Sequence, residues 1–265
     1  MNPRLKGKNM VITGASSGIG AQMALKAAAS GAGNIALVAR RKDKLEELVK
    51  EIESVSSARA FAFSADVSKR EEVEKIFGEI FAKLSTVDIL VNNAGFGVFD
   101  EIHEAGWEEI QGMVDVNVLG LISCTMMVLP HMKERKSGHI INVASQAGKI
   151  ATPNSSVYSA TKHAVLGFTN SLRMEVMNDG IFVTAVNPGP IATNFFDIAD
   201  RSGSYVKNVQ RWMLKPEEVA EKVVLSMGTN KREINLPGWM NTGSILYTLF
   251  PRLVERLGRN AFMKK

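Results

Sequence analysis

Tyr158 and Lys162 place a phenol and an ammonium group four residues apart. On a helix, side chains at this spacing lie on the same face, so the two groups would be neighbours. Reduction of a carbonyl by hydride requires a proton for the developing alkoxide, and a tyrosine can donate it if its pKa falls from about 10. A fall of about three units corresponds to about 4 kcal/mol, which a nearby ammonium would help to supply. The pair predicts acid–base chemistry; the alternative is a buried tyrosine beside a solvated lysine.

Ser145 follows an apolar run at 139–144 that has the character of a buried strand. The carboxyl edge of such strands is where open α/β sheets bind ligands. A hydroxyl there can hold a substrate oxygen while negative charge builds on it. We therefore predict that Ser145 acts together with Tyr158 and Lys162.

A glycine-rich segment, Thr13–Gly20, reads TGASSGIG and lies between the first expected strand and the first expected helix. Glycines let the chain turn tightly and let backbone N–H groups approach a pyrophosphate, whose charge the helix N-terminus favours. A tight turn without a ligand is the alternative, but the strand–turn–helix context favours a nucleotide site. The expected contacts come from Gly14, Ser16, Ser17, Gly18, Ile19 and Gly20.

The end of the second expected strand indicates which dinucleotide is bound. An acidic residue about 20 positions after the glycines would bond a ribose 2′-hydroxyl, whereas an arginine accommodates a 2′-phosphate. Arg40 and Arg41 occupy this place, and Asp43 and Glu46 fit a capping box that opens the next helix. Because guanidinium groups suit phosphate, we predict NADP(H) as cofactor and regard NAD(H) as the less favoured choice. A solvated basic turn is the alternative.

Short apolar runs alternate with amphipathic stretches along the chain. This alternation predicts βαβ units and a single α/β domain built on a doubly wound, Rossmann-type parallel sheet of seven strands with helices on both faces. We expect strands at 8–13, 34–39, 59–64, 88–92, 139–144, 181–187 and 233–236. We expect helices at 19–30, 43–55, 69–84, about 104–135, 157–177 and 216–227. The catalytic domain would span 1–237, with a C-terminal extension at 238–265.

Together these motifs make the sequence resemble the short-chain dehydrogenase/reductase (SDR) family over about residues 6–237. The family's glycine motif matches Thr13, Gly14, Gly18 and Gly20, and its N-N-A-G motif matches residues 92–95. Its remaining motifs match Asp66 with Val67, Asn117, Ser145, the Y-x3-K pair at Tyr158 and Lys162, and Pro188 with Gly189.

The resemblance implies a role for each matched residue. Tyr158 would donate the proton in reduction and accept it in oxidation, helped by the positive charge of the nicotinamide, while Lys162 would also bond the nicotinamide ribose. Ser145 would position the carbonyl, and Asn117 would hold a water in a proton relay. Further cofactor contacts are implied for Asp66, Val67, Asn93, Ala94, Gly95, Pro188, Gly189, Ile191 and Thr193. Many NADP-preferring members also carry a basic residue in the glycine loop, where this chain has Ser16 and Ser17.

Two segments outside these motifs are rich in apolar residues. The loop at about 189–215 is long enough to be a lid. Its apolar side chains indicate either a substrate with an apolar part or packing of the lid on the body; they are Phe195, Phe196, Ile198, Tyr205, Val206, Trp212 and Met213.

The C-terminal extension has its own apolar stripe, which runs from Ile245 to Leu257, with Pro251 able to begin a second helical segment. Arg252, Arg256 and Arg259 lie off the stripe. Such a helix can rest on an anionic membrane, but we favour packing against another subunit or over the mouth of the site.

Composition excludes several other classes of protein. The 265 residues are 45% hydrophobic and 22% charged, which is typical of a globular protein. The single cysteine, Cys124, excludes a disulfide framework and is interpreted as a core residue. The four histidines (His103, His131, His139 and His163) lack metal-ligand spacing, so no metal is expected.

The net charge of +5 arises within residues 231–265, so the body lacks the basic character of a nucleic-acid binder. The chain begins Met1-Asn2-Pro3-Arg4, and the weakly polar stretch 119–129 is far shorter than the about 20 residues of a spanning helix. We expect a cytoplasmic enzyme that converts small carbonyl or alcohol substrates. The resemblance implies a homodimer or homotetramer formed through the helices at 104–135 and 157–177.

Overall fold

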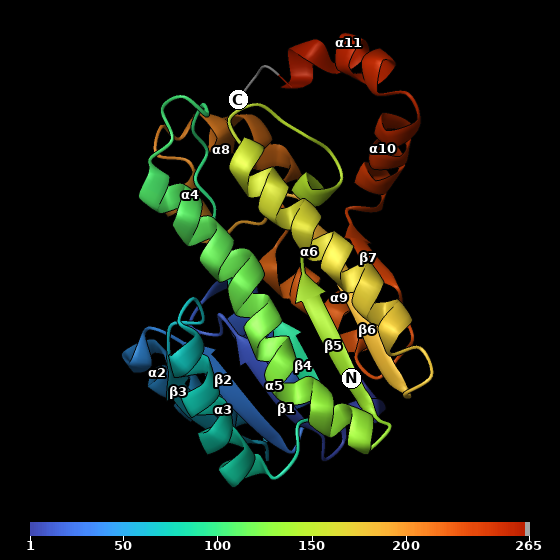
Figure 1. Cartoon of the computed structure of the whole chain (residues 1–265). Coiled ribbons are helices and arrows are strands. Elements are labelled where there is room, and N and C mark those ends of the chain that lie inside the picture. Colours follow the sequence, from blue (N-terminus) through green and yellow to red (C-terminus); the bar gives the residue numbers. More distant parts are fainter. Residues whose placement is uncertain (263–265) are drawn as a thin grey trace.

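The computed structural model describes residues 1–262, with side chains through residue 258 (Figure 1). Seven strands in this range form one parallel sheet in the order β3-β2-β1-β4-β5-β6-β7. The strands are β1 (Asn9–Thr13), β2 (Asn34–Ala39), β3 (Arg59–Ser64), β4 (Ile89–Asn92), β5 (Gly138–Val143), β6 (Ile181–Pro188) and β7 (Glu233–Leu236). The predicted doubly wound fold is confirmed, with strand ends within one residue of those expected.

Helices connect the strands and follow the last one. The α-helices are α1 (Gly18–Ala29), α2 (Lys42–Val55), α3 (Arg70–Leu84), α4 (Trp107–Val114), α5 (Leu121–Glu134), α6 (Ser156–Glu175), α7 (Phe195–Ala199), α8 (Ser204–Val209), α9 (Pro216–Ser226), α10 (Gly238–Leu249) and α11 (Pro251–Phe262). Short 3-10 turns occupy η1 (Pro3–Leu5), η3 (Gln146–Gly148) and η4 (Gln210–Trp212), and η2 (Asp115–Gly120) is a π-helical turn.

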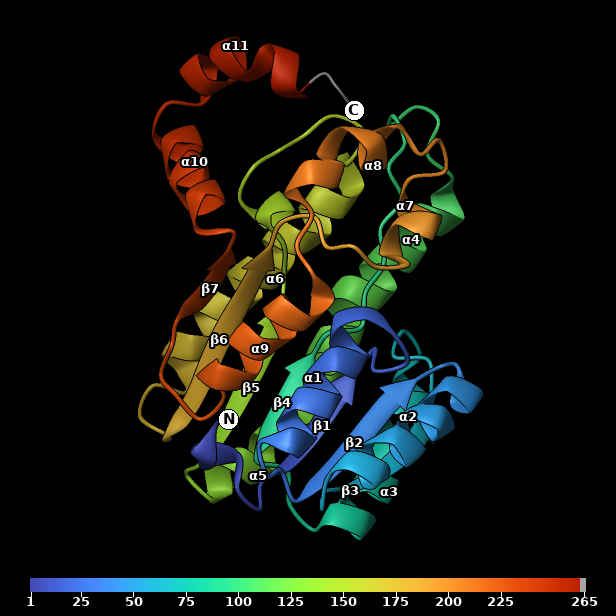
Figure 2. The ribbon, with the colours of Figure 1, turned by 180° about the vertical axis from the view of Figure 1, so that it is seen from behind.

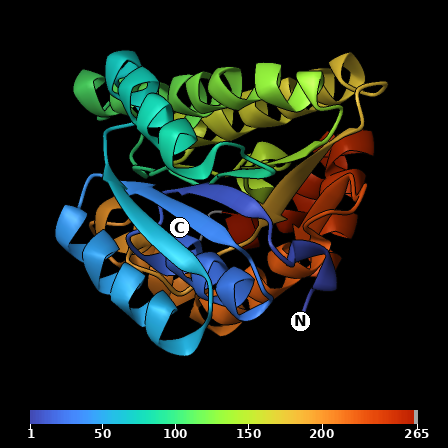
Figure 3. The same cartoon turned by 90° about the horizontal axis from the view of Figure 1, so that it is seen from below.

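Alternate side chains of the strands enter two separate cores, because both faces of the sheet are covered (Figure 3). On one face, Met10 and Ile12 of β1 pack with α1, α2 and α9. On the other face, Val11 packs with α3, α5 and α6. A sheet covered on both faces requires strands of almost entirely apolar residues. These apolar runs allowed the strands to be predicted from the sequence.

The strand order places the reversal of the winding between β1 and β4. β1 pairs with β2 on one side and with β4 on the other, so the connections that follow these two strands diverge. A crevice opens at the carboxyl ends of strands at such a switch point. The glycine-rich segment follows β1 and the N-N-A-G motif ends β4, so the topology brings both to this crevice.

The long helical region expected at 104–135 forms a continuous run from Trp107 to Glu134, but it is not α-helical throughout. The π-helical turn η2 interrupts it, and one extra residue in a turn of this kind often marks a functional site. Among the described residues, this run is the one helix with the length and apolar composition to cross a membrane. Met113, Leu121 and Val128 of this run are buried, whereas Leu119 and Met126 are about half exposed.

The C-terminal extension forms two helices, and Pro251 begins the second of them. α10 packs against β7 and η3, whereas α11 contacts α10 and arches beyond the carboxyl ends of the strands (Figures 1 and 2). The apolar stripe of the extension, as far as it is described, is largely exposed, for example at Leu249, Leu253 and Leu257. Lys264, Lys265 and the side chain of Arg259, which belong to the predicted basic tail, lie outside the described residues.

The buried ionisable side chains include Cys124 and His139, which lie outside the cavity. Cys124 of α5 is buried as expected, and burial raises the pKa of its thiol to about 12. His139 of β5 is also buried, and burial lowers the pKa of its imidazole to about 4. The backbone N–H of Gly228 donates to its Nδ1 at 3.1 Å, so Nε2 carries the proton and donates to Thr184 Oγ1 at 2.9 Å. The ring is therefore a neutral link between β5, β6 and the chain that leads to β7.

Candidate active site

A cavity of about 1700 Å³ lies at the carboxyl ends of the strands, where the switch point predicts a ligand. It brings together the predicted residues from six separate loops. All the predicted catalytic and cofactor residues line it except Gly20 and Asn117, which lie behind its wall.

The glycine loop is built around backbone positions that a side chain would obstruct. Gly14 has φ +66°, and a Cβ there would lie 2.8 Å from Ala94 Cα. A Cβ on Gly20 would collide with the carbonyl oxygen of Gly14, which explains why Gly20 matters although it does not line the cavity. No side chain caps α1 at Ser17, so the backbone N–H groups of its first turn remain suited to an anionic ligand.

Asn93 fastens this loop to the end of β4. Its Nδ2 donates to the carbonyl oxygens of Thr13 at 2.9 Å and Gly14 at 3.1 Å. In return, Thr13 Oγ1 accepts from the backbone N–H groups of Asn93 and Ala94, both at 3.0 Å. The N-N-A-G motif and the threonine of the glycine motif thus form one hydrogen-bonded unit, which holds the cavity floor in shape.

Arg41 crosses from the end of β2 to the glycine loop. Its Nη2 donates to Ser16 Oγ at 3.0 Å and to Ser17 Oγ at 2.8 Å. The predicted capping box is wrong: α2 begins at Lys42, so Asp43 already lies inside the first turn and cannot act as the cap. The helix-preceding residue is Arg41 itself, whose extended backbone directs its guanidinium toward the loop.

Arg40 lies on the other side of the same corner, near Asp66 at the end of β3. The hydroxyl of Ser64 donates to the carbonyl oxygen of Arg40 at 3.1 Å. Burial acts to raise the pKa of Asp66, but two hydrogen bonds from Ser68 and the charge of Arg40 outweigh it and hold that pKa below its usual value. Asp66 therefore stays a carboxylate at neutral pH, and its charge lies at the same corner as the guanidinium groups of Arg40 and Arg41.

Ser145, Tyr158 and Lys162 meet in the cavity. Ser145 follows β5, and its Oγ accepts from the N–H of Ala147 at 3.0 Å. Tyr158, in the first turn of α6, is hydrogen-bonded to Ser145, and Lys162 lies one helical turn later with its Nζ 5.7 Å from the centre of the Tyr158 ring. Lys162 Nζ also donates to the carbonyl oxygen of Val143 at 3.0 Å. Geometry thus brings the three predicted catalytic groups together.

The protonation states of this cluster depart from the sequence-based expectation. Burial raises the pKa of Tyr158 to about 12, an effect that its hydrogen bond with Ser145 partly offsets. Burial also lowers the pKa of Lys162 to about 8. Loss of hydration therefore outweighs the attraction of the ammonium in the protein alone. Tyr158 is protonated at neutral pH, which is the state that a proton donor requires.

Asn117 occupies the π-helical turn η2, behind the cluster. Its Nδ2 donates to the carbonyl oxygen of Phe96 at 2.8 Å and to Thr161 Oγ1 at 3.1 Å, and its Oδ1 accepts from the N–H of Phe96 at 3.0 Å. The side chain thereby clamps the loop after β4 to α6. Its role in a proton relay stays a prediction.

The predicted lid encloses Tyr158 with aromatic rings. The segment 189–215 contains α7, α8 and η4, and the rings of Phe195 and Phe99 both lie 5.7 Å from that of Tyr158. Tyr205 lies 5.3 Å from Phe99, edge to face. Phe196 is buried and Trp212 is about half exposed, and both line the cavity. Phe99 was missed from the sequence, because it follows the N-N-A-G motif in a loop without a periodic pattern.

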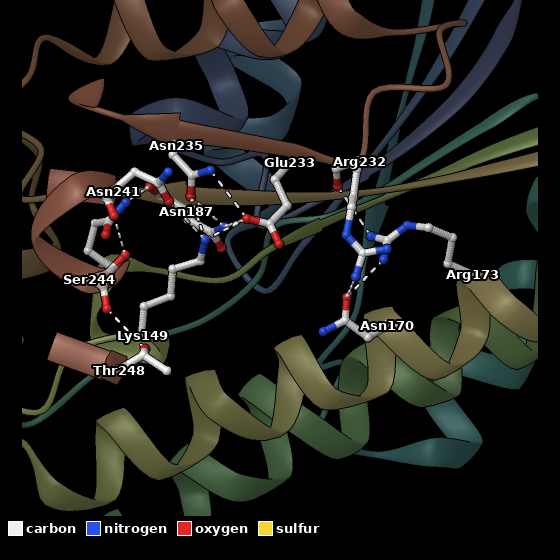
Figure 4. A network of polar contacts seen from close by, with 11 residues as sticks. Lys149, Asn170, Arg173, Asn187, Arg232, Glu233, Asn235, Asn241, Ser244 and Thr248 are labelled. Atoms are coloured by element: carbon white, nitrogen blue, oxygen red, sulfur yellow. Dashed lines mark hydrogen bonds and ion pairs between the residues drawn. The ribbon is translucent and has the colours of Figure 1, made fainter. Parts of the chain in front are cut away.

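A polar network also missed from the sequence ties the Ser145 turn to the end of the sheet (Figure 4). Lys149 Nζ pairs with Glu233 Oε2 of β7 at 2.5 Å and donates to Asn235 Oδ1 at 2.9 Å and Asn241 Oδ1 at 3.2 Å. Asn187 of β6 donates to the same Asn235 oxygen at 2.9 Å. Burial acts to raise the pKa of Glu233, but hydrogen bonds from Lys149 and Asn235 together with the charges of Lys149 and Arg232 outweigh it, so that the pKa lies below its usual value. The network joins η3, β6, β7 and α10.

Comparisons with known proteins agree with this architecture. The short chain dehydrogenase family matches residues 8–201. The chain is 33% identical over 230 residues to the NADP-dependent 3-hydroxy acid dehydrogenase of Schizosaccharomyces pombe, with 84% of this chain and 88% of that protein covered. It is 37% identical over 226 residues to the glycine betaine reductase of Emericella nidulans, which covers 84% of this chain but only 18% of that much longer protein.

A solved structure is similar over most of its length. The alcohol dehydrogenase from the archaeon Thermococcus sibiricus, complexed with 5-hydroxy-NADP, superposes with a TM-score of 0.77 at 29% identity, covering 86% of this chain and 95% of that one. The family match, the relatives and the shared seven-stranded sheet agree. The chain belongs to the short chain dehydrogenase family, and it is a nicotinamide-dependent oxidoreductase that acts on alcohol or carbonyl groups.

Proposed function

We propose that this protein is an NADP(H)-dependent oxidoreductase that interconverts a carbonyl and an alcohol on a substrate with an apolar part. The single observation that carries the proposal is the cluster of Ser145, Tyr158 and Lys162 inside one cavity with the glycine loop. Aromatic rings around Tyr158 support an apolar substrate. The reduction of a 3-oxoacyl thioester is a specific form of the same proposal.

The residues of the cavity fit a dinucleotide. Gly14 and Gly20 let the glycine loop pack tightly against Ala94 and against its own backbone, and the uncapped start of α1 offers N–H donors to a pyrophosphate. Arg40 and Arg41 supply guanidinium groups where the adenosine ribose of a dinucleotide in this fold would carry a 2′-phosphate. When bound, NADP(H) supplies a hydride for reduction or accepts one in oxidation.

Side chains of this protein donate the proton and stabilise the charges that develop. Tyr158 Oη donates its proton to the substrate oxygen in reduction, while the substrate carbon gains the hydride, so that a carbonyl plus a hydride and a proton gives an alcohol. Ser145 donates a hydrogen bond to the same oxygen as negative charge develops. The ammonium of Lys162 stabilises the tyrosinate that remains, and bulk solvent then returns the proton. Oxidation runs through the same steps in reverse.

The remaining parts of the proposal concern the assembly and its place in the cell. We propose a homodimer or homotetramer formed through α4–α5 and α6, and exposed apolar residues such as Leu119, Met126 and Met174 on those helices support it. We also propose a cytoplasmic location. We propose no nucleic-acid partner, and the neutral charge balance of residues 1–230 supports this second point.

A comparison of turnover with binding tests the catalytic proposal. Oxidation of NADPH is followed by its absorbance with a panel of aldehydes and ketones. Tyr158→Phe should lower kcat by about a hundredfold to ten-thousandfold, because the proton donor is lost, and should retain NADPH binding measured by fluorescence. Tyr247→Phe, on exposed α10, is the matched control and should keep the wild-type rate. NADPH binding by the wild type without turnover of any carbonyl would instead identify a nucleotide-sensing protein.

A further inference from the structure

The cavity does not end at the aromatic rings around Tyr158. It continues to the lid residue Trp212, to Trp239 and Met240 in the first turn of α10, and to Leu257 of α11. These four residues are named here the apolar arm. Trp212 and Trp239 are in contact edge to face, with ring centres 5.6 Å apart, so the lid and the C-terminal extension meet in the arm.

The apolar arm begins next to the reaction centre. A Cβ on Gly189, which follows β6, would lie 2.7 Å from Met240 Sδ and 3.3 Å from Pro237 Cδ. Gly189 and Tyr158 line the same cavity. Met240 therefore packs directly on the loop beside the catalytic cluster, and Trp239 and Trp212 extend the apolar wall away from it.

The side chains of the arm are more exposed than core residues of their size. Trp212 is 46% exposed, Trp239 57% and Leu257 77%. Covering apolar surface is favourable by about 25 cal/mol per Å², so an apolar ligand along the arm would gain from it. Figures 1 and 2 show α11 beyond the carboxyl ends of the strands. Its residue Leu257 lines the cavity.

The size of the cavity also exceeds the needs of a small substrate. Ligand pockets commonly measure about 300–1,000 Å³, whereas this one measures about 1700 Å³. A dinucleotide would fill the part between the glycine loop and Lys162. The remaining part runs from Tyr158 to α11 and is lined by aromatic and aliphatic side chains, with polar side chains such as Lys207 and Arg211 on the lid side.

We propose that the apolar arm is a binding subsite for an aliphatic chain, so that the substrate is a long-chain aliphatic aldehyde, ketone or alcohol with its reactive carbon at Tyr158. This inference rests on the proposed function and names the substrate class of the same site. Met240 contacts the part of the chain nearest the reacting carbon, Trp239 and Trp212 flank its middle, and Leu257 covers its far end.

A series of straight-chain aldehydes from butanal to dodecanal tests the subsite through activity. Each methylene buried along the arm should raise kcat/KM by about twofold to fourfold until the chain passes Leu257. Trp239→Ala should lower the ratio of kcat/KM for decanal to that for butanal by about tenfold. Trp107→Ala removes an exposed tryptophan from the start of α4, outside the cavity, and should leave this ratio at its wild-type value.

Tryptophan fluorescence gives a second readout that needs no turnover. Two of the three tryptophans lie in the arm, so decan-1-ol titrated into the full chain without nucleotide should change the emission. Trp107→Phe should retain this change, and the double variant Trp212→Phe/Trp239→Phe should lose it.

The outcomes separate the two proposals. A wild-type kcat/KM that does not vary with chain length, or an emission that decan-1-ol leaves unchanged, overturns the apolar arm while the proposed function stands. NADPH binding without reduction of any aldehyde overturns the proposed function, and a fluorescence response in that case still supports chain binding by the arm.

Discussion

Arg41 shows how one side chain can supply what a neighbouring motif lacks. The glycine loop carries Ser16 and Ser17 where many NADP-preferring members of the family carry a basic residue. Arg41 reaches both serine hydroxyls, so a guanidinium lies over the loop although it arises from the end of β2. The positive charge that the glycine loop lacks in its own sequence is therefore supplied by Arg41, which lies 24 and 25 residues further along the chain.

This placement predicts a selective effect on cofactor affinity. Arg41→Ala should raise the Kd for NADPH by about tenfold to a hundredfold, because hydrogen bonds to a charged group contribute about 1.5–3 kcal/mol. The Kd for NADH should change far less, because that cofactor has no 2′-phosphate. Fluorescence titration of both cofactors measures the two constants. Lys42→Ala, an exposed neighbour, is the control, and equal losses for both cofactors would assign Arg41 to the pyrophosphate or to folding.

At the residue scale, spacing predicted the meeting of Tyr158 and Lys162 but not their ionisation. A four-residue interval on a helix is a local property, and it puts both groups on one face. The pKa of Tyr158 depends on burial by Phe99 and Phe195, which come from separate loops. No local sequence pattern indicates this burial. The direction of the pKa shift of Tyr158 could therefore not be derived from the sequence.

At the scale of elements, the neutral ring of His139 links β5 and β6 with the chain that leads to β7. Its Nε2 donates to Thr184 of β6, and its Nδ1 accepts from Gly228 in the chain that leads to β7. Thr184 Oγ1 in turn donates a hydrogen bond to the carbonyl oxygen of Lys231 at 2.5 Å. Protonation of the ring would turn its Nδ1 from an acceptor into a second donor and oppose the N–H of Gly228.

The folded protein should therefore lose stability in mild acid. Because burial lowers the pKa of His139 to about 4, the unfolded chain binds a proton near pH 6.5 before the folded chain does. The contribution is fully present above about pH 6.5 and falls by up to about 1.4 kcal/mol per unit as the pH drops toward 4. Urea unfolding at several pH values measures the slope.

His139→Gln provides the comparison for this slope. Glutamine keeps a donor and an acceptor without titrating, so the free energy of unfolding of the variant should vary less steeply between pH 6.5 and 4. Its value at pH 7 can fall without affecting the test. Parallel curves for both proteins would mean that His139 does not contribute to the acid sensitivity.

The boundaries of elements were predictable where periodicity is strong. The seven strands matched because a parallel sheet buried on both faces needs continuous apolar runs. The π-helical turn at Asp115–Gly120 was hidden inside a helical pattern, because one added residue barely changes the order of apolar positions. The start of α2 shifted by one residue to Lys42, which was enough to remove Asp43 from the capping position.

At the scale of the whole molecule, the Lys149–Glu233 pair joins the catalytic turn to the last strand and the C-terminal extension (Figure 4). The partners are 84 residues apart in the chain, and Lys149 reaches Asn241 across 92. Contacts between residues so far apart in the chain produce no periodic pattern in the sequence. The network and the position of α10 could therefore not be predicted from the sequence.

A double-mutant cycle measures how strongly this pair couples the two regions. Lys149→Met and Glu233→Gln should each destabilise the fold, and chemical denaturation should give a coupling free energy of about 1–2 kcal/mol, because both side chains are largely buried. The more exposed pair Lys133–Asp179 should couple by less than about 1 kcal/mol. Equal coupling in both cycles would show that the network adds no more than a surface ion pair.

The burial of Cys124 has a practical consequence for attaching a fluorescent label to α11. At neutral pH its sulfur is almost entirely the unreactive thiol, and it is buried in the core on the inner face of α5, so reagents such as maleimides should leave the native chain untouched. Leu257→Cys would then create the sole site for attaching a dye, without first deleting a natural thiol. A fluorophore at position 257 would lie beside the cavity and would report a change in its surroundings when a ligand binds there.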